Sequence, residues 1–126
     1  MAEAVTTYPY RRKLASRSYA GGQAPQPTHM GFGDGGHESD GSPKNPNPEK
    51  TTLNHELLRK ALDSTYQEDD YSLTGVGRVA KSELIGASMS EAGLFDEDGE
   101  LMGFKNMAVK IKESDEEYEV RIKLKY

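Results

Sequence analysis

The sequence predicts an α+β fold, in which one amphipathic helix packs on a small, mostly antiparallel sheet, with an extended N-terminal arm and a long Gly/Pro loop. Three segments support this expectation. Residues 51–64 have the apolar spacing of a helix, residues 90–106 have the pattern of a β-hairpin, and residues 118–126 alternate strictly as a strand does. We therefore divide the chain into an arm over residues 1–28 and a domain over residues 29–126.

Length and composition indicate one small domain. The chain has 126 residues, of which 34% are apolar, and most of its glycines and prolines lie in the first half. Such a chain buries little apolar surface by itself, so we expect partner chains to contribute to its stability. The net charge of −5 argues against a nucleic-acid-binding domain. The chain has no cysteine, which excludes disulfides and thiolate chemistry.

The hydropathy of the chain predicts no membrane association. No run approaches the ~20 apolar residues that a membrane helix needs. The N-terminus also lacks the apolar central stretch of a secretory signal. We therefore expect a protein that is made and assembled in the cytoplasm.

The arm is basic and rich in tyrosine, and its glycines and prolines predict an extended conformation. Arms of this composition bind single-stranded nucleic acid by stacking, but the acidic chain favours an arm that lies on another protein subunit. The alternative is that the tyrosines pack locally or are disordered. The candidate partner-binding residues of the arm are Tyr8, Tyr10, Arg11, Arg12 and Tyr19. Phe32, at the start of the loop that follows, is a further candidate.

A long polar loop, "GFGDGGHESDGSPKNPNPE", follows at residues 31–49. Its glycines and prolines leave no room for a regular element, and a loop of this length in a small domain is usually functional or partly disordered. The glycines suggest phosphate binding. However, the Lys-Ser/Thr pair of a P-loop is missing, so we do not expect a phosphate site.

The predicted helix at residues 51–64 begins at Thr51 or Thr52, either of which can cap it. His55 and Glu56 suggest metal or acid–base chemistry. No second histidine follows four residues later, so we interpret both as solvated or interface groups. The apolar stripe of this helix consists of Leu53, Leu57, Leu58, Ala61 and Leu62.

Two further segments predict strands. Residues 65–85 have β character, and Gly75 and Gly77 within them indicate a bulge or a close backbone approach. Segment 118–126 places its apolar residues on one face and its charged residues on the other. The turn "KESDEE" connects it to an earlier alternation around Val109.

The stretch "SEAGLFDEDGELMGFKN", residues 90–106, allows two interpretations. Asp96 and Asp98 have the spacing of a calcium loop, but such a loop needs glycine at its sixth position and glutamate at its twelfth. Leu101 and Met107 occupy those positions. Gly99 after Asp98 suits a tight turn, so we predict a β-hairpin without a metal.

The order of three motifs carries a family resemblance. "MGFGDGG", "LNHELLRKAL" and "SEAGLFDEDGELMGFKN", at these separations, resemble the N-terminal domain of phage tail-collar fibre proteins over about residues 29–126. That family has a Gly-Asp-Gly segment, a loop with proline, a Leu-Asn-Glu-Arg helix and a hairpin with Asp-Gly at its tip. Its members usually open with a helix and continue into a shaft, and this chain departs from both features.

The resemblance implies a virion structural protein, assembled in the host cytoplasm, that attaches a fibre to the tail or baseplate. It implies other tail proteins and a fibre protein as partners, and a homo-oligomer, either a trimer or a hexamer. We also expect Glu56 or Glu91 to pair with Arg59 and so to join the helix to the hairpin. The residues that match the family motifs, which we interpret as framework and assembly residues, are Gly33, Asp34, Gly35, Leu53, Asn54, Glu56, Arg59, Glu91, Gly93, Leu94, Asp96 and Gly99.

Two alternative functions are a metal-dependent binding module and an enzyme. A small calcium- or metal-dependent binding module would use carboxylates at Asp34, Asp40, Asp96 and Asp98, or the histidines, and the spacing argues against it. An enzyme would need a nucleophile and base, a metal cluster or a cofactor loop, and the sequence has none of these patterns. We therefore expect no catalytic residue, no cofactor and no metal.

Overall fold

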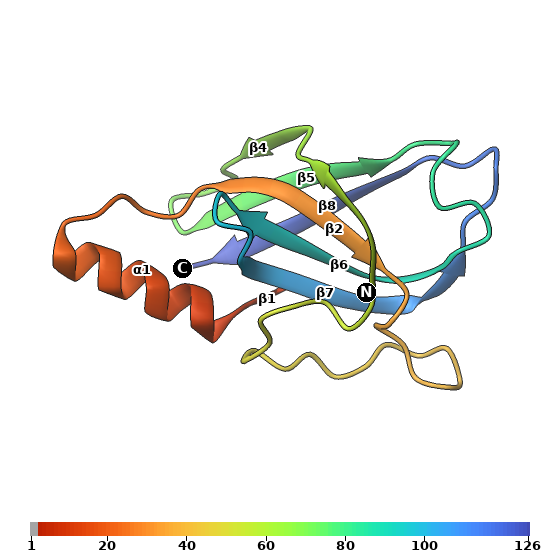
Figure 1. The fold of residues 1–126 in the computed structure, drawn as a ribbon, viewed down its shortest axis with the longest axis horizontal. Coiled ribbons are helices and arrows are strands. Elements are labelled where there is room, and N and C mark those ends of the chain that lie inside the picture. The colour runs from red at the N-terminus through yellow and green to blue at the C-terminus, as the bar shows by residue number, and fades with distance from the viewer. Residues whose placement is uncertain (1–2) are drawn as a thin grey trace.

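The computed structural model describes residues 3–126, which form two stacked antiparallel sheets with one helix at one end (Figure 1). Residues 1 and 2, which belong to the predicted arm, lie outside the described part. The elements, in chain order, are β1 (Val5–Thr6), α1 (Tyr8–Ala20), β2 (Pro27–Gly33), β3 (Glu56–Ala61), β4 (Ser64–Tyr66), β5 (Ser72–Val79), β6 (Ser88–Asp96), β7 (Leu101–Ile111) and β8 (Tyr118–Lys125).

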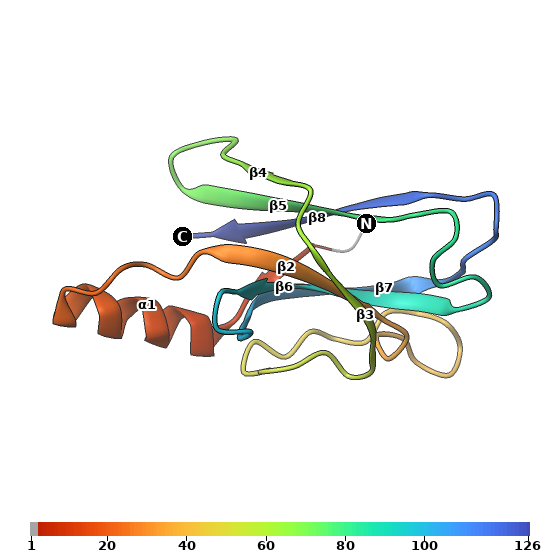
Figure 2. The ribbon, with the colours of Figure 1, turned by 45° about the horizontal axis from the view of Figure 1, so that its top comes forward.

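The larger sheet has five strands in the order β1-β7-β6-β2-β3, and the smaller sheet has three in the order β4-β5-β8. All strand pairs are antiparallel. Figure 2 shows the two sheets as separate layers, with β5 and β8 lying over β2, β6 and β7. Strand β6 is the centre of the larger sheet, so its side chains determine what packs on both faces.

The main core fills the space between the two sheets. Phe32, Leu94 and Ile122, from three different strands, are fully buried there. Two glycines of β5 allow the sheets to approach closely. A Cβ atom on Gly75 would lie 2.6 Å from Leu94 Cδ1, and one on Gly77 would lie 2.6 Å from Met30 Sδ. The glycine backbones do lie close to the other sheet, but the atoms that they meet belong to side chains, and no bulge interrupts the pairing of β5 with β8.

The predicted α+β fold is wrong, because the structure is mainly β and the expected amphipathic helix does not exist. Residues 56–61 form strand β3, which pairs with β2 at the sheet edge. The leucines whose spacing suggested a helix lie in different environments. Leu58 packs against the main core and Leu53 against a second cluster, whereas Leu57 is exposed. Pairing with β2 therefore overrides the high helix propensity of this segment.

The prediction of an extended arm is also wrong, because residues 8–20 form helix α1. The Thr7 side chain caps the helix by accepting a hydrogen bond from the Tyr10 amide, and Pro9 lies in the first turn. Gly21, with φ of +79°, ends the helix in the left-handed conformation. These are ordinary start and stop signals. The segment lacks an apolar stripe, which is why periodicity did not reveal the helix.

The predicted hairpin and C-terminal strand are confirmed. Strands β6 and β7 pair across the turn at residues 97–100, and Gly99 has a φ of +79° as that turn requires. Strand β8 directs Val120, Ile122 and Leu124 into the core. Its alternation survives in the structure because β8 has one buried face and one exposed face.

The opposite face of the larger sheet carries a smaller core. Phe95, Leu101 and Phe104 from the hairpin are buried there, and Leu53 from the long loop packs on them. This loop connects β2 to β3 and runs over the face that the smaller sheet does not cover (Figure 2). The loop is therefore a covering layer of the domain.

We predict that Gly75→Ala lowers the free energy of unfolding by about 1–3 kcal/mol, as overpacking of a core does. The new methyl group would clash with the buried Leu94 side chain. Urea denaturation measures the change. Gly22→Ala is the matched control, because the nearest atom to its new Cβ is 3.6 Å away. Equal stabilities of the two variants would contradict the close contact between the sheets.

Candidate functional site

The motif residues of the loop and hairpin meet at the carboxylate of Glu91. This side chain lies on the central strand β6 and is fully buried. Its Oε1 accepts a hydrogen bond from the Asn54 amide at 2.8 Å. Its Oε2 accepts from the amides of Gly35 at 2.9 Å and His55 at 2.8 Å. The loop thus supplies three backbone donors, from both of its ends, to one buried negative charge.

The glycines of the loop are needed for space around this carboxylate. A Cβ atom on Gly33 would lie 2.3 Å from the His55 carbonyl oxygen, and one on Gly35 would lie 2.9 Å from Glu91 Oε2. A Cβ atom on Gly36 would lie 2.2 Å from the Ser90 carbonyl oxygen. The Gly-Asp-Gly segment is therefore explained by the close packing of the loop backbone on β6.

Further polar contacts close the two ends of the loop on each other. Asp34 accepts a hydrogen bond from His55, and the Asn54 side-chain amide donates to the Gly35 carbonyl at 2.7 Å. The Ser90 hydroxyl accepts from the Gly36 amide at 2.8 Å. Because Glu91 is buried and its two oxygens accept hydrogen bonds from amides, its carboxylate holds the loop in place and is not accessible as an acid or base.

The expected pairing of Arg59 occurs with Glu56. The Arg59 guanidinium donates to both Glu56 oxygens at 2.8 Å and lies 3.6 Å from the ring centre of Phe95. Both charged residues belong to strand β3. The contact with Phe95 nevertheless joins β3 to the hairpin, as a cation over an aromatic face.

The hairpin turn is organised by a second buried carboxylate, Asp96. Its Oδ1 accepts hydrogen bonds from the amides of Asp98 at 2.9 Å and Glu100 at 3.0 Å, and its carbonyl accepts from Gly99. Its side chain is 1% exposed. The acidic stretch is therefore a tight turn in which the first carboxylate binds the backbone of the residues that follow.

Two basic side chains of helix α1 bind this turn. Lys13 Nζ lies 2.7 Å from Asp96 and 2.8 Å from Asp98, and Arg17 pairs with Asp98 at 2.9 Å and with Glu97 at 3.1 Å. Burial alone would lower the pKa of Lys13, but the hydrogen bonds to the two aspartates raise it above its usual value. The hydrogen bonds from Lys13 and Arg17 hold the pKa of Asp98 below its usual range.

The position of Lys13 argues against a calcium site in the hairpin turn. The Lys13 ammonium occupies the space between the turn carboxylates, where a calcium ion would have to bind. Within residues 3–126, no group of three or more histidine or acidic side chains is arranged to hold a metal ion. No observation on the hairpin therefore favours the metal-dependent module.

The predicted partner-binding residues divide into buried and exposed ones. Phe32 is fully buried and Tyr10 is 4% exposed, so both belong to the core. Tyr8 is 47% exposed and Tyr19 is 96% exposed. The two predicted arginines contact the chain itself: Arg12 pairs with exposed Glu49 at 2.8 Å, and Arg11 donates to the Lys125 carbonyl.

The remaining motif residues serve the packing of the hairpin. Gly93 leaves space for Leu53 and Leu101, whose methyl carbons would lie 2.9 and 2.7 Å from an added Cβ. Leu94 lies between the sheets. Sequence reasoning missed the roles of Lys13 and Arg17, although their spacing of four residues on one helix face matches the acidic turn that they bind.

The arrangement of these motifs agrees with a comparison against known families. The sequence model for the N-terminal part of the phage tail-collar fibre protein matches residues 1–123. The chain belongs to this tail-collar fibre protein family. The match includes β1 and α1, so it begins well before residue 29. Helix α1 also removes the apparent departure from a family that opens with a helix. A comparison with curated proteins found no match.

Membership makes the chain a phage tail structural protein and a virion component. Such proteins contact other tail proteins. In residues 3–126 no helix is long and apolar enough to span a bilayer, since α1 has 13 residues.

We predict that Glu91→Gln lowers the free energy of unfolding of the tail-collar domain by about 3 kcal/mol, because it removes the charge that three amides bind and places an amide donor against them. Chemical denaturation measures the loss. Glu38→Gln is the control, because Glu38 lies exposed on the same loop. A loss no larger than that of the control would mean that the carboxylate does not hold the loop.

A further prediction concerns the pH dependence of the contact between α1 and the hairpin turn. Hydrogen bonds from Lys13 and Arg17 hold the folded-state pKa of Asp98 below its ordinary value of 3.8. The stabilisation that Asp98 gives to the α1–turn contact is therefore complete above that ordinary value and is lost as pH falls through the lowered folded-state value.

Amide NMR shifts of α1 in the tail-collar domain, followed from about pH 6 to pH 2.5, should report this release. Asp98→Asn should weaken the pH dependence, because the carboxylate that contacts both Lys13 and Arg17 is then absent. Shifts of α1 that stay constant over the whole range would contradict the electrostatic contact.

Proposed function

We propose that this tail-collar domain is an adaptor that attaches a tail fibre or receptor-binding protein to the tail or baseplate of a phage or phage-like contractile particle, without catalytic activity. The observation that supports the proposal most directly is the position of helix α1. It projects from one end of the sandwich, and the C-terminal residue lies at the same end (Figure 1).

Exposed aromatic side chains gather at this end. Tyr8 and Tyr19 lie on α1, and Tyr71 and Tyr126 are joined by a backbone hydrogen bond at the tips of β5 and β8. Tyr71 is 73% exposed and Tyr126 is 52% exposed. Tyrosine is enriched in the centres of protein interfaces, where a ring is buried and its hydroxyl is bonded. We infer that this tyrosine-bearing end contacts a neighbouring tail protein.

The assembly we propose has several copies of the domain around a symmetric tail, as a trimer or hexamer. Small domains that depend on neighbours commonly form closed rings of this kind. The mass of the purified domain in solution, alone and with co-expressed tail proteins, tests this part. A monomer that ignores those proteins would contradict it.

The tyrosine-bearing end is tested by point substitution. Deletion of residues 1–28 would also remove Tyr10 and Thr7 from the core and is therefore unsuitable. We predict that Tyr8→Ala combined with Tyr19→Ala weakens co-purification with tail proteins about tenfold or more, as truncation of interface aromatics does.

The matched control is Ile85→Ala. Ile85 is 57% exposed and lies in the β5–β6 connection, at the end of the sandwich opposite α1 (Figure 1). Thermal unfolding of each variant checks that the fold is retained. Unchanged co-purification of the double tyrosine variant, or equal loss in the Ile85 variant, would overturn the assignment of this end.

A further inference from the structure

One side of the sandwich presents two strands with unoccupied edges. Strand β1 covers β7 only at Gly103 and Phe104, although β7 extends to Ile111. Strand β8 is the last strand of the smaller sheet and pairs with β5 alone. The edge of β8 therefore lies open beside β7, and a groove follows the two strands.

The hydrogen bonds at the end of β8 show which of its backbone groups face the open edge. The Lys125 amide donates to Thr6 Oγ1 at 3.0 Å, whereas the next amide, of Tyr126, donates to the Tyr71 carbonyl beside β5. Odd-numbered residues of β8 therefore direct their amide and carbonyl groups to the open edge. Among the described residues, none forms a hydrogen bond with the backbone of Arg121 or Lys123 on that side.

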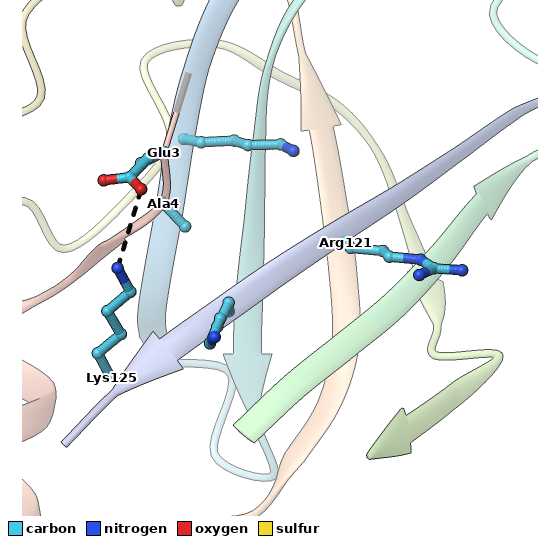
Figure 3. Close-up of a pocket in the computed structure, with 6 residues that line it drawn as sticks. Glu3, Ala4, Arg121 and Lys125 are labelled. Atoms are coloured by element: carbon cyan, nitrogen blue, oxygen red, sulfur yellow. Dashed lines mark ion pairs between the residues drawn. The ribbon is translucent and has the colours of Figure 1, made fainter. Parts of the chain in front are cut away.

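Basic side chains line the groove beside the backbone groups of Arg121 and Lys123. A pocket of about 220 Å³ contains four basic side chains and one acidic side chain. In Figure 3, Glu3 and Lys125 lie together at one end, while the Arg121 guanidinium extends away from them. The lining residues are Glu3, Ala4, Lys105, Arg121, Lys123 and Lys125.

Lys105 is the distinctive member of this pocket. It projects from β7, is partly buried, and has no carboxylate within ion-pair distance among residues 3–126. Burial lowers its pKa. By contrast, Lys123 pairs with Glu68 at 2.9 Å and Lys125 with Glu3 at 3.9 Å. A partly desolvated cation without an acidic neighbour favours a carboxylate from outside the domain.

A second, mainly apolar pocket lies towards the start of β8. Its volume is about 330 Å³, and it is lined by Met89, Met107, Ala108, Tyr118 and Val120 together with Lys110, Glu117 and Glu119. Val120 directly precedes Arg121, so successive stretches of β8 line the two pockets. An extended ligand that follows β8 would meet first the apolar pocket and then the cations.

We propose that the open edge of β8 binds an extended, acidic segment of a partner chain by strand addition. The segment's backbone would pair with Arg121 and Lys123, an apolar side chain would enter the pocket at Val120, and a carboxylate would reach Lys105. Backbone pairing supplies affinity, and the pockets supply specificity. The inference deepens the proposed function, on which it rests for the identity of the partner as a tail protein.

Charge also disfavours a symmetric pairing with a second copy of the chain. Pairing of β8 with the same edge of a second copy, centred on Ile122, would place Arg121 against Lys123 of that copy. It would also bring two Lys105 side chains into one groove. Basic residues commonly protect exposed edges from such self-pairing. An acidic strand removes this repulsion, so the same residues select against a copy and for an oppositely charged segment.

The probe is a synthetic peptide of about eight residues, the usual length of a strand, with alternating valine and glutamate. Amide hydrogen exchange by NMR reports where it binds on the whole domain. With the peptide at about ten times its Kd, exchange at Arg121 and Lys123 should slow about tenfold. The same peptide with lysine in place of glutamate, and one with central prolines, should give no protection.

A matched pair of variants tests the role of the Lys105 ammonium group in binding. Lys105→Gln should weaken binding of the acidic peptide about twofold to fivefold, the value of one ion pair. Lys81→Gln removes an exposed lysine of the β5–β6 connection that lines neither pocket, and it should leave binding unchanged. Unprotected Arg121 and Lys123 amides, equal binding of the basic peptide, or protection caused by dimerisation would each overturn the proposal.

The results that test the β8 inference can be distinguished from the results that test the proposed function. Loss of tail-protein binding in the Tyr8 and Tyr19 variant, together with no peptide binding, would overturn only the β8 inference. Peptide protection at β8 with unchanged binding by the tyrosine variant would instead overturn the role of the α1 end.

Discussion

The burial of the Glu91 carboxylate is the constraint on which the rest of the structure depends. A negative charge on the central strand of a sheet is strongly unfavourable unless it is hydrogen-bonded. Among residues 3–126 no basic side chain forms an ion pair with it, and three loop amides provide the compensation. The loop must therefore return to β6 at both of its ends. In returning, it places Leu53 over the hairpin aromatics and completes the second core.

The hairpin repeats this arrangement at its tip. Asp96 lies five residues after Glu91 on the same strand, is also buried, and also binds backbone amides. Its charge is balanced by Lys13 from α1. One strand thus carries two carboxylates, of which the first fixes the long loop and the second fixes the N-terminal helix. This explains how a chain with few apolar residues orders segments that contribute little to the main core.

The local patterns of the chain predicted those elements whose environment is simple. Strand β8 has one buried face, and the hairpin turn depends on Gly99 and its neighbours, so both were visible in the sequence. The segment at residues 56–61 was mistaken for a helix because its leucines are shared between two cores, which a single periodic stripe cannot describe. Helix α1 was missed because ion pairs with the turn hold it, while only Tyr10 is buried.

The candidate site was predictable only in composition. The motif residues were identified, but nothing local indicated that Gly35, Asn54 and Glu91 would meet, since 56 positions separate the first and last of them. Their contact depends on the topology that brings β2 beside β6. Likewise, the buried state of Phe32 follows from the stacking of the second sheet, which the sequence did not indicate.

The contact between Tyr10 and Tyr126 has a mechanical consequence. Their hydroxyl groups are 2.6 Å apart and their rings meet edge to face, so the first helix and the last residue are held together. Strand β8 is also paired with β5 along its full length. Tension applied at residue 126 along this strand would load its hydrogen bonds together in shear. An antiparallel pair pulled in this direction resists far better than one opened bond by bond.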